Sequence, residues 1–428
     1  MKLRIWLLLS LLASGITCLY TIRVLTPWEY YVDVEHGRLK ARMDDLYSPW
    51  VGTRELLLRG RNPYGQEVSH EIQMAFYGHV LNQAYGKAGV EVLNEQRFAY
   101  PVYVVFLLAP TAYMDFSRLQ ILASVVFAIL TAISVLFWLD VLYWKPPRTL
   151  VAAILLFVLS SPQIMQGLRL RQMGMVVGFL LALTAWCITR NRLAIAGVML
   201  AISTVKPQMA LLPLAWFLLW GVSNWPKRWP LLAGFGVTFI GLVGLGELIL
   251  PGWHRYFLDG LSAYRQYSPS PSLLCIALGD WMGLAISGIV ILGLSVLAWR
   301  NREKDATTPE FIQTLAAIFI GTTIVLPLLA PFNQVLLLLP AMMVVRNWLT
   351  LPRFGRRLFA FTVAWPWITS AVLLLLVHPR LDSPSRLPLL QSAMVLFVPF
   401  LLAWLSTTIR SKTGRLPSPP REATSVSL

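Results

Sequence analysis

The sequence predicts an all-α membrane protein: a bundle of about twelve transmembrane helices with interfacial helices in a long first extracytoplasmic loop. Of its 428 residues, 57% are hydrophobic and only 13% are charged. The mean hydropathy of +0.63 lies well above that of soluble proteins. Apolar runs of about 17 to 25 residues recur along the chain, each long enough to cross a hydrocarbon core of roughly 30 Å. The runs do not alternate in polarity as barrel strands do, so helices are the expected spanning form.

The net charge of +16 does not indicate a nucleic-acid-binding protein, because the basic residues form short caps between apolar runs. Such caps follow the positive-inside rule, which favours Lys and Arg in cytoplasmic loops. We therefore expect a cytoplasmic N-terminus and a cytoplasmic, disordered tail at 411–428. The cysteines have neither disulfide nor metal-ligand spacing. The caps lie at 145–148, 190–192, 227–228, 300–304, 346–357 and 410–421.

The caps also orient the crossings. With both ends inside, residues 26–97 form one extracytoplasmic loop of a single membrane domain, 1–410. Of the stretches 98–114 and 150–162, only one can cross fully if 190–192 are to stay inside. We expect 98–114 to be re-entrant or interfacial, because it is short and opens on Tyr100-Pro101. The other crossings are expected near 5–22, 117–143, 173–189, 193–205, 207–221, 231–250, 281–299, 311–330, 332–345, 358–377 and 388–409.

The loop 26–97 holds ten of the twenty acidic residues, so chemistry in water is expected there. Asp44 and Asp45 begin a predicted helix that ends at Gly60. A second amphipathic stretch, 71–85, is expected to lie along the membrane surface. Either aspartate could instead be an ordinary helix N-cap. The pair could also hold a divalent cation, but neighbouring residues on a helix point about 100° apart, so we expect no metal or other cofactor.

Three cations stand on the expected outer side, against the topological bias. Arg169 and Arg171 lie in the segment 162–172, and Lys206 lies in the short turn before Pro207. Charges at the membrane edge that break the rule are candidates for a functional site. The structural alternative is that their side chains extend to lipid phosphates.

Several short motifs between 45 and 207 form a recognisable set. They are Asp45-Leu46-Tyr47, the segment 57–64 (LLRGRNPY), Phe98-Ala99-Tyr100-Pro101, Leu108-Ala109-Pro110, the Gln-Gly region at 166–172, and the helix 196–207 that ends in Lys206-Pro207. Together they resemble the C-superfamily of membrane glycosyltransferases. They are most similar to the polyprenol-phosphate-mannose-dependent α-mannosyltransferases of glycosyltransferase family 87.

This resemblance implies inverting transfer of a hexose, mannose above all, from a polyprenyl-phosphate donor to a hydroxyl of a glycolipid or glycan acceptor. The reaction would take place at the extracytoplasmic face of the plasma (inner) membrane, with membrane lipids as partners and no nucleic acid. Asp45 is expected to be the general base, with Asp44 as second choice. The side chains expected to bind the substrate or the lipid phosphate are Lys206, Arg169, Arg171, Gln172, Gln166, Tyr64 and Asn333.

One motif departs from the family pattern. Family members often have Ser-Pro-x-x-Trp-x-His in a late outer turn, whereas this chain reads Ala330-Pro331-Phe332-Asn333-Gln334. His254 or His378 could replace the missing histidine, or either could be an ordinary interfacial residue. Two other functions stay open: a flippase or exporter of lipid-linked sugars, and a transferase like the O-antigen ligases. Both predict that Asp45 is dispensable.

Overall fold

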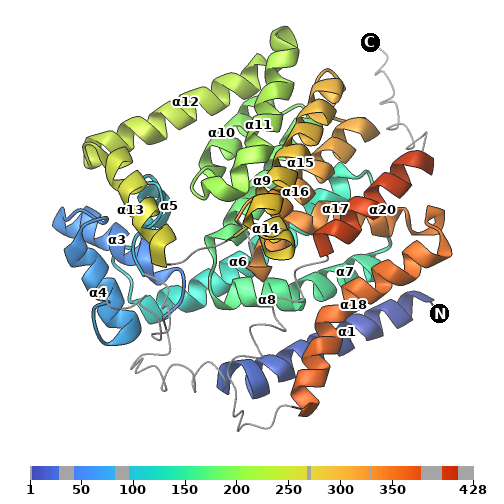
Figure 1. Ribbon diagram of the computed structural model, residues 1–428, viewed down its shortest axis with the longest axis horizontal. Coiled ribbons are helices and arrows are strands. Elements are labelled where there is room, and N and C mark those ends of the chain that lie inside the picture. Colours follow the sequence, from blue (N-terminus) through green and yellow to red (C-terminus); the bar gives the residue numbers. More distant parts are fainter. Residues whose placement is uncertain are drawn as a thin grey trace, which may run out of the picture.

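The computed structural model describes residues 2–27, 43–81, 96–267, 271–327, 330–376 and 398–412 (Figure 1). Within these ranges 82% of the residues are helical and none lies in a strand. The predicted all-α class is therefore confirmed. Residues 413–428 of the predicted tail, His378 and residues 388–397 of the predicted last crossing lie outside the described residues; residues 411–412, predicted to be in the disordered tail, form the end of the last helix.

The first loop contains two short helices, as predicted. α3 (Tyr47–Arg59) follows Asp45 directly and ends at Gly60, whose φ of +65° is a left-handed conformation that favours glycine. α4 spans Gln66–Tyr77 and ends at Gly78, with a φ of +73°. The predicted stretch 71–85 was therefore placed too late: the helix begins directly after the turn at 62–65, and the left-handed Gly78 stops it before His79. Residues 82–85 lie outside the described part.

α3 is packed into the protein instead of lying freely on a surface. Trp50, Val51 and Leu56 are buried, and Gly52 lies so close to Phe98 that an added Cβ would stand 2.2 Å from its ring. The Trp50 indole donates a hydrogen bond to the carbonyl of Thr111 (3.1 Å). These contacts hold α3 against the segment 98–111 and so fix the residues that precede it, Asp44 and Asp45.

The two doubtful apolar stretches differ in shape. Residues 98–114 contain only α5 (Val104–Leu108) and the 3₁₀ helix η2 (Ala109–Thr111), which are too short to cross, in accord with the prediction. Residues 148–169 form α7 (Arg148–Leu159) and α8 (Pro162–Arg169), bent by 60° at their junction. The single straight crossing predicted at 150–162 is therefore replaced by a broken span or a re-entrant pair.

Most remaining helices begin and end close to the predicted limits. They are α1 (Lys2–Tyr20) with the π-helix η1 (Thr21–Leu25), α6 (Phe116–Val141), α9 (Met173–Thr189), α10 (Leu193–Ser203), α11 (Pro207–Ser223), α12 (Trp225–Ile249), α15 (Asp280–Asn301), α16 (Pro309–Val325) and α18 (Arg353–Leu376). The predicted crossing 332–345 is instead the 3₁₀ helix η3 (Pro331–Leu337) followed by the short α17 (Leu338–Arg346), and α20 (Val398–Lys412) covers the later part of the predicted 388–409. The described residues also form helices that were not predicted: α13 (Trp253–Tyr267), α14 (Leu273–Leu278) and the 3₁₀ helix η4 (Trp348–Thr350).

By length and composition, four described helices can cross a membrane: α1 with η1, α6, α12 and α15; the bent pair α7–α8 would make a fifth. α9, α11 and α16 have 17 apolar-rich residues each, and α10 has 11. A helix rises about 1.5 Å per residue, so these are short for a full crossing. The protein is an integral membrane protein, and the number of about twelve crossings stays a prediction.

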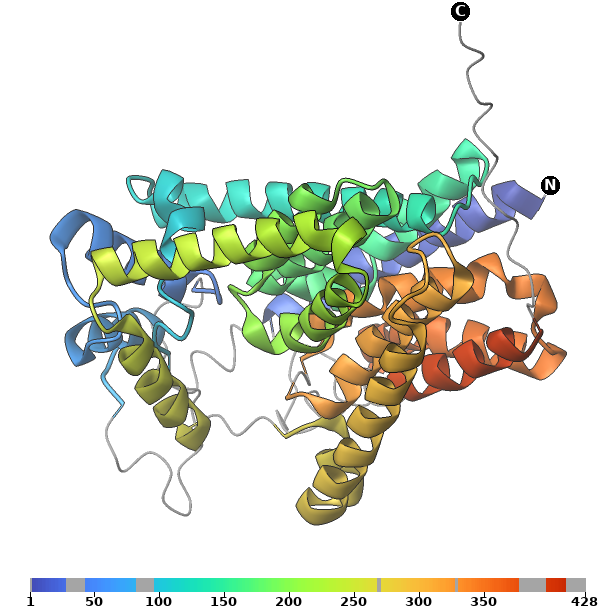
Figure 2. The ribbon, with the colours of Figure 1, turned by 90° about the horizontal axis from the view of Figure 1, so that it is seen from above.

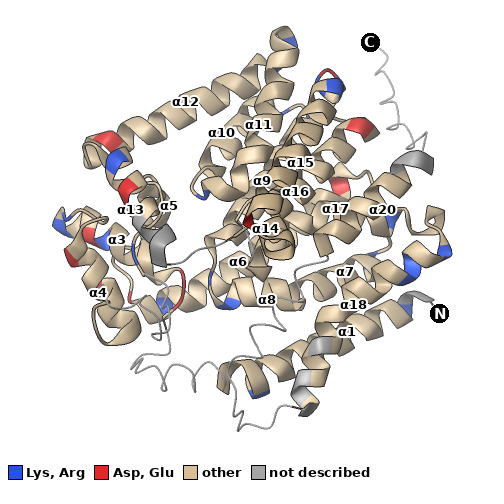
Figure 3. Ribbon diagram, viewed as in Figure 1, with Lys and Arg blue, Asp and Glu red and all other residues tan. Residues whose placement is uncertain are grey.

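The arrangement brings the ends of several helices together around α9. This helix packs against α6, α10 and η3, and η3 also packs against α8. Figure 1 shows α3, α4, α5 and α13 gathered at one end of the molecule, and Figure 2 shows the same group from above. In Figure 3 most charged residues lie in that group or near the far ends of α12, α15 and α18, and the helices between are almost free of charge.

Candidate functional site

Four segments that are far apart in the sequence meet beside the N-terminus of α9. The first is 43–46, before α3, the second is the α8–α9 turn 170–172, and the third is the α10–α11 turn 204–206. Gln172 connects them: its Nε2 donates to Asp45 Oδ2, and its Oε1 accepts from Lys206 Nζ at 3.1 Å. The fourth segment, η3, places the Phe332 ring 5.1 Å from Lys206 Nζ. A carboxylate and an ammonium group therefore lie at the two ends of one amide.

Local backbone structure presents each of these side chains. Lys206 is the residue before Pro207, which begins α11, and Pro207 requires the extended backbone that turns the lysine inward. The same turn is held by Tyr103, whose hydroxyl contacts Thr204 Oγ1 at 3.0 Å. Arg171 has a φ of +48°, uncommon for a residue other than glycine, and this left-handed turn leads into Gln172.

Asp44 has a structural position. Its Oδ1 accepts a hydrogen bond from the backbone N–H of Leu46 (3.0 Å), as in an Asx turn, and the N-cap of α3 is Leu46, so neither aspartate is the N-cap. Its Oδ2 accepts from Gln120 Nε2 and from Arg171 Nη1, each at 2.7 Å. Arg171 is held in turn by the Gln120 carbonyl and the Ser124 hydroxyl, both 3.1 Å from its Nε. Both oxygens of the buried Asp44 are therefore occupied by donors from the protein.

Asp45 is less fully bound. It is partly exposed, and its Oδ1 receives no hydrogen bond from the described part of the chain. Burial raises the pKa of Asp45 to about 6. The hydrogen bond from Gln172 and the positive charge of Lys206 lower this pKa and so offset part of the effect of burial. Burial lowers the pKa of Lys206 to about 8, and the charge of Asp45 opposes that change. Near pH 7, Asp45 is therefore mainly ionised and Lys206 mainly protonated, each close to its titration range.

Asn333 lies close to Lys206, because the side chains of both approach Gly174. A Cβ built on Gly174 would stand 3.3 Å from Lys206 Nζ and 3.6 Å from Asn333 Oδ1. Asn333 is buried, and its Oδ1 has no hydrogen-bond partner among the residues that the structure describes. The late turn that departs from the family pattern thus still lies at the site, and it brings the Asn333 amide next to Lys206.

The other predicted residues are not all brought into this cluster. Arg169 contributes its backbone carbonyl, which accepts from Arg171 Nη1 at 2.8 Å. Gln166 lies on α8, and its buried Oε1 has no partner in the described residues. Tyr64 donates its hydroxyl to the Tyr100 carbonyl (2.6 Å) and packs against Phe98. For Tyr64 the contacts are those of a residue that fixes the turn at 62–65.

The two histidines give no replacement in the described structure. His254 is exposed on α13, and its Nδ1 lies 3.7 Å from Glu247 Oε2. His378 is outside the described residues. No group of three His, Cys, Asp or Glu side chains within the described ranges is placed to hold a metal ion, and the donors around Asp44 occupy the oxygens that such an ion would need.

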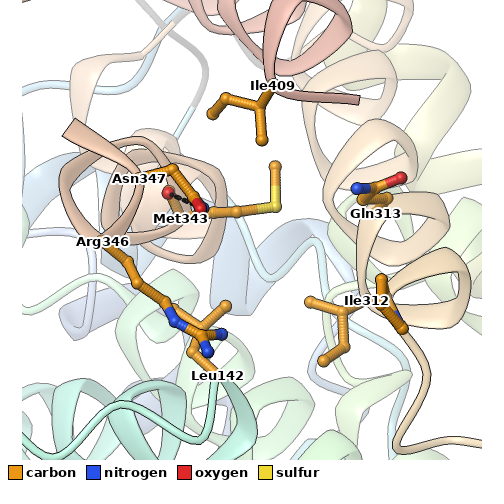
Figure 4. A pocket seen from close by; sticks show the side chains of 8 residues that line it. Leu142, Ile312, Gln313, Met343, Arg346, Asn347 and Ile409 are labelled. Atoms are coloured by element: carbon orange, nitrogen blue, oxygen red, sulfur yellow. Dashed lines mark hydrogen bonds between the residues drawn. The ribbon is translucent and has the colours of Figure 1, made fainter. Parts of the chain in front are cut away.

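A hollow elsewhere in the molecule has a different character. It lies between α16, α17 and α20 and the end of α6, and Figure 4 shows Met343 and Ile409 on its walls, with Asn347 Nδ2 donating to the Met343 carbonyl (2.8 Å). Its charged lining residue is Arg346, and the lining residues include no carboxylate. It therefore offers no candidate base.

Sequence reasoning missed Gln120, Ser124, Phe332 and Gly174. Gln120 and Ser124 had a detectable signal: they stand four residues apart, hence on one face, in the otherwise apolar helix α6. In the sequence, Phe332 looks like an ordinary apolar residue of the late turn, and Gly174 looks like an ordinary residue of an apolar helix. Their role follows only from the packing of η3 on α8 and α9.

Comparison with known proteins gives one finding. The family model described as glycosyltransferase family 87 matches residues 98–327, which is more than half of the chain. The matched range includes Gln120, Arg171, Gln172 and Lys206 and ends before η3; Asp44 and Asp45 precede it. No curated protein and no solved structure matches the chain.

Proposed function

Because the chain belongs to glycosyltransferase family 87, we propose that it transfers a hexose, mannose in the first place, from a polyprenyl-phosphate donor to an acceptor hydroxyl with inversion. The observation that carries this proposal is the group Asp45–Gln172–Lys206: a partly exposed carboxylate fixed by one amide to a buried ammonium group. Family membership supports the class of reaction, and the geometry supports the roles below.

Asp45 takes the proton of the acceptor hydroxyl. Its Oδ2 is held by Gln172, and its Oδ1 is left for the acceptor. A pKa of about 6 keeps the carboxylate ionised near neutral pH and still basic enough to accept a proton as the oxygen attacks. The acceptor oxygen forms its bond to the anomeric carbon while the bond from that carbon to the donor phosphate oxygen breaks. One base and one direct displacement give inversion.

Lys206 stabilises the departing polyprenyl phosphate. The leaving group gains negative charge as the glycosidic bond breaks, and a fixed cation in a site with little water favours that charge. Lys206 is suited to this role because it is buried and held by Gln172. The Asn333 amide beside it can donate from its Nδ2 to a phosphate oxygen, the contact that the histidine of the family pattern is expected to make.

The proposed reaction requires a site at the membrane surface. The isoprenoid tail of the donor is apolar, and its sugar phosphate is polar. The Asp45–Gln172–Lys206 group must therefore lie where the membrane helices meet the aqueous phase. We place this side outside the cytoplasm, at the inner membrane, because the basic caps predict that side for 26–97. The acceptor is a glycolipid or glycan hydroxyl.

The test is transfer of radiolabelled mannose from polyprenyl-phosphate-mannose to endogenous lipid acceptors, in membranes that contain wild type, Asp45→Asn or Asp115→Asn at equal amounts. Asp115 is a matched control: its carboxylate is 79% exposed and lies beside the helix α6 that supports the site. We expect Asp45→Asn to lower the rate by about 10² to 10⁴-fold and Asp115→Asn to leave it unchanged.

Other outcomes are equally informative. Transfer retained by Asp45→Asn would remove the assigned base. Transfer from a different polyprenyl-phosphate hexose would correct the sugar and keep the mechanism. No transfer with several donors, together with movement of a fluorescent lipid-linked sugar across vesicle membranes, would replace the proposal with the flippase function.

A further inference from the structure

The start of α18 carries an unusual basic cluster. Arg353, Arg356 and Arg357 stand within its first turn or just beyond, and no acidic residue is found there. Together with Trp348 and Ala360 they line an open groove of about 300 Å³. Cations at the N-terminal end of a helix meet the positive end of its dipole and repel one another, so this arrangement is unfavourable without a negative partner.

Some arginines of the other basic caps are held by partners within the protein. Arg190 pairs with Asp140 at 2.5 Å. Arg302 pairs with Glu303 at 2.9 Å, and the buried Arg228 donates to four backbone carbonyls, those of Trp220, Arg302, Glu303 and Lys304. By contrast, none of the three groove arginines has an ion pair within the described ranges. The positive-inside rule explains why arginines are present, but it does not explain why these three share one groove unpaired.

The surroundings of the groove indicate which anion it fits. Leu349 is 85% exposed and Phe354 is 67% exposed beside it, and the segment 358–376 that follows is apolar. Exposed apolar side chains next to arginines and a tryptophan are typical of the level of lipid headgroups. Trp348 is held against Phe359 with ring centroids 6.0 Å apart, so one wall of the groove is fixed before anything binds.

We propose that the groove formed by Trp348, Arg353, Arg356, Arg357 and Ala360 binds the phosphodiester headgroup of an anionic phospholipid. The guanidinium groups can hold phosphate oxygens in a bidentate manner, while Leu349 and Phe354 enter the acyl region. This site is separate from the Asp45 group and takes a lipid of the bilayer, not the sugar donor.

The test uses the full-length protein in neutral detergent, titrated with phosphatidylglycerol or with phosphatidylcholine, with lipid binding followed by native mass spectrometry. The variant combines Arg353→Gln, Arg356→Gln and Arg357→Gln. The matched control combines Lys227→Gln, Arg300→Gln and Lys304→Gln, which removes the same charge from three exposed positions of other caps. Each basic residue near an anionic surface contributes about fivefold in affinity, so we expect the groove variant to lose at least tenfold for phosphatidylglycerol.

The control variant is expected to keep wild-type affinity, and phosphatidylcholine should bind equally weakly to all three proteins. Equal losses in both triple variants would show diffuse charge attraction and overturn the groove, as would no loss in either. Inorganic phosphate that competes with phosphatidylglycerol at equal concentration would overturn the lipid as occupant. Unfolding temperatures measured without lipid show whether the groove variant is folded; if it is not, Arg357→Gln alone is compared with Arg300→Gln, with about a fivefold loss expected.

Discussion

At the scale of single residues, two neighbouring aspartates differ in what surrounds them. Asp44 gives both oxygens to donors from the protein, and Asp45 keeps one oxygen without a hydrogen bond from the described residues. The sequence placed both at the start of α3 and favoured Asp45. It could not have separated their roles, because Gln120, Arg171 and Gln172 reach them from positions 75 or more residues away.

The pH dependence of transfer follows from the pair Asp45 and Lys206. The base must be ionised, so kcat/KM should rise with pH through about 6, the pKa of Asp45. The leaving phosphate needs the protonated lysine, so kcat/KM should fall as pH rises through about 8, the pKa of Lys206. We expect a bell-shaped profile with its maximum near pH 7. In Lys206→Arg the decrease of kcat/KM near pH 8 should disappear, because an arginine stays protonated there. A decrease near pH 8 that persists in this variant would belong to another group.

The stability of Asp45→Asn should also depend on pH. Burial holds the folded pKa of Asp45 above its unfolded value, so the folded state binds a proton that the unfolded state has released. The stability contributed by this carboxyl is full below pH about 4 and is lost as pH rises through about 6. Asp45→Asn should therefore unfold at an equal or higher temperature than wild type at pH 8. The measurement is thermal unfolding in detergent at pH 5 and pH 8.

A clear drop in the unfolding temperature of Asp45→Asn at pH 8 would mean that the ionised carboxylate stabilises the fold. Loss of transfer in that variant would then have a structural cause. The two measurements together therefore distinguish a base from a structural residue.

At the scale of elements, the site is built where helices end. The start of α3, the α8–α9 turn, the α10–α11 turn and η3 supply its side chains, and α6 supports them through Gln120 and Ser124. Helix ends could be read from proline, glycine and charge patterns, and α3, α9, α10 and α11 begin close to the predicted positions. Their convergence could not be read, because it depends on the packing of α6, α8 and η3 around α9.

The pair Asp44–Arg171 should act as a structural connection between the first loop and the α8–α9 turn. Asp44 is 3% exposed and Arg171 22% exposed, with 2.7 Å between Oδ2 and Nη1. Asp44→Asn removes the charge and leaves the arginine without its carboxylate, at a cost of about 1 to 3 kcal/mol. We expect a lower unfolding temperature and a partial loss of transfer, since Asp45 and Gln172 flank the pair.

The double variant Asp44→Asn with Arg171→Gln checks this connection. If the two groups stabilise each other, the combined loss of stability should be smaller than the sum of the single losses, by more than about 0.5 kcal/mol. Additive losses would show that the two residues act independently and that the 2.7 Å contact contributes little.

At the scale of the whole molecule, composition was sufficient for the class and insufficient for the number of crossings. Continuous apolar runs and spaced basic caps predict a helical membrane protein. Length then separates α6, α12 and α15, with 22 to 26 residues each, from α10 with 11. A run of apolar residues does not reveal where a helix bends. The 60° break between α7 and α8 is an example.

The sidedness of the molecule gives the last prediction. The positive-inside rule places the loop with Asp115 on the outer side and the loop with Lys304 on the cytoplasmic side. In a variant whose cysteines at 18, 187 and 275 are replaced by alanine, Asp115→Cys should react in intact cells with a thiol reagent that cannot cross membranes. Lys304→Cys should react only after the membrane is opened. Both positions are exposed, so a failure to react reflects the side of the membrane and not burial.

The reverse pattern would place Asp45 on the cytoplasmic side, because Trp50 of α3 is bonded to Thr111, four residues before Asp115. The donor headgroup would then have to lie at the cytoplasmic surface. The proposed chemistry would be unchanged, but the reaction would take place on the cytoplasmic side of the membrane. Equal labelling of both positions in intact cells would mean that the segment between them crosses an even number of times. Because the three full-length spans α6, α12 and α15 lie in that segment, an even total would require an odd number of crossings among the bent pair α7–α8 and the shorter helices α9, α10 and α11.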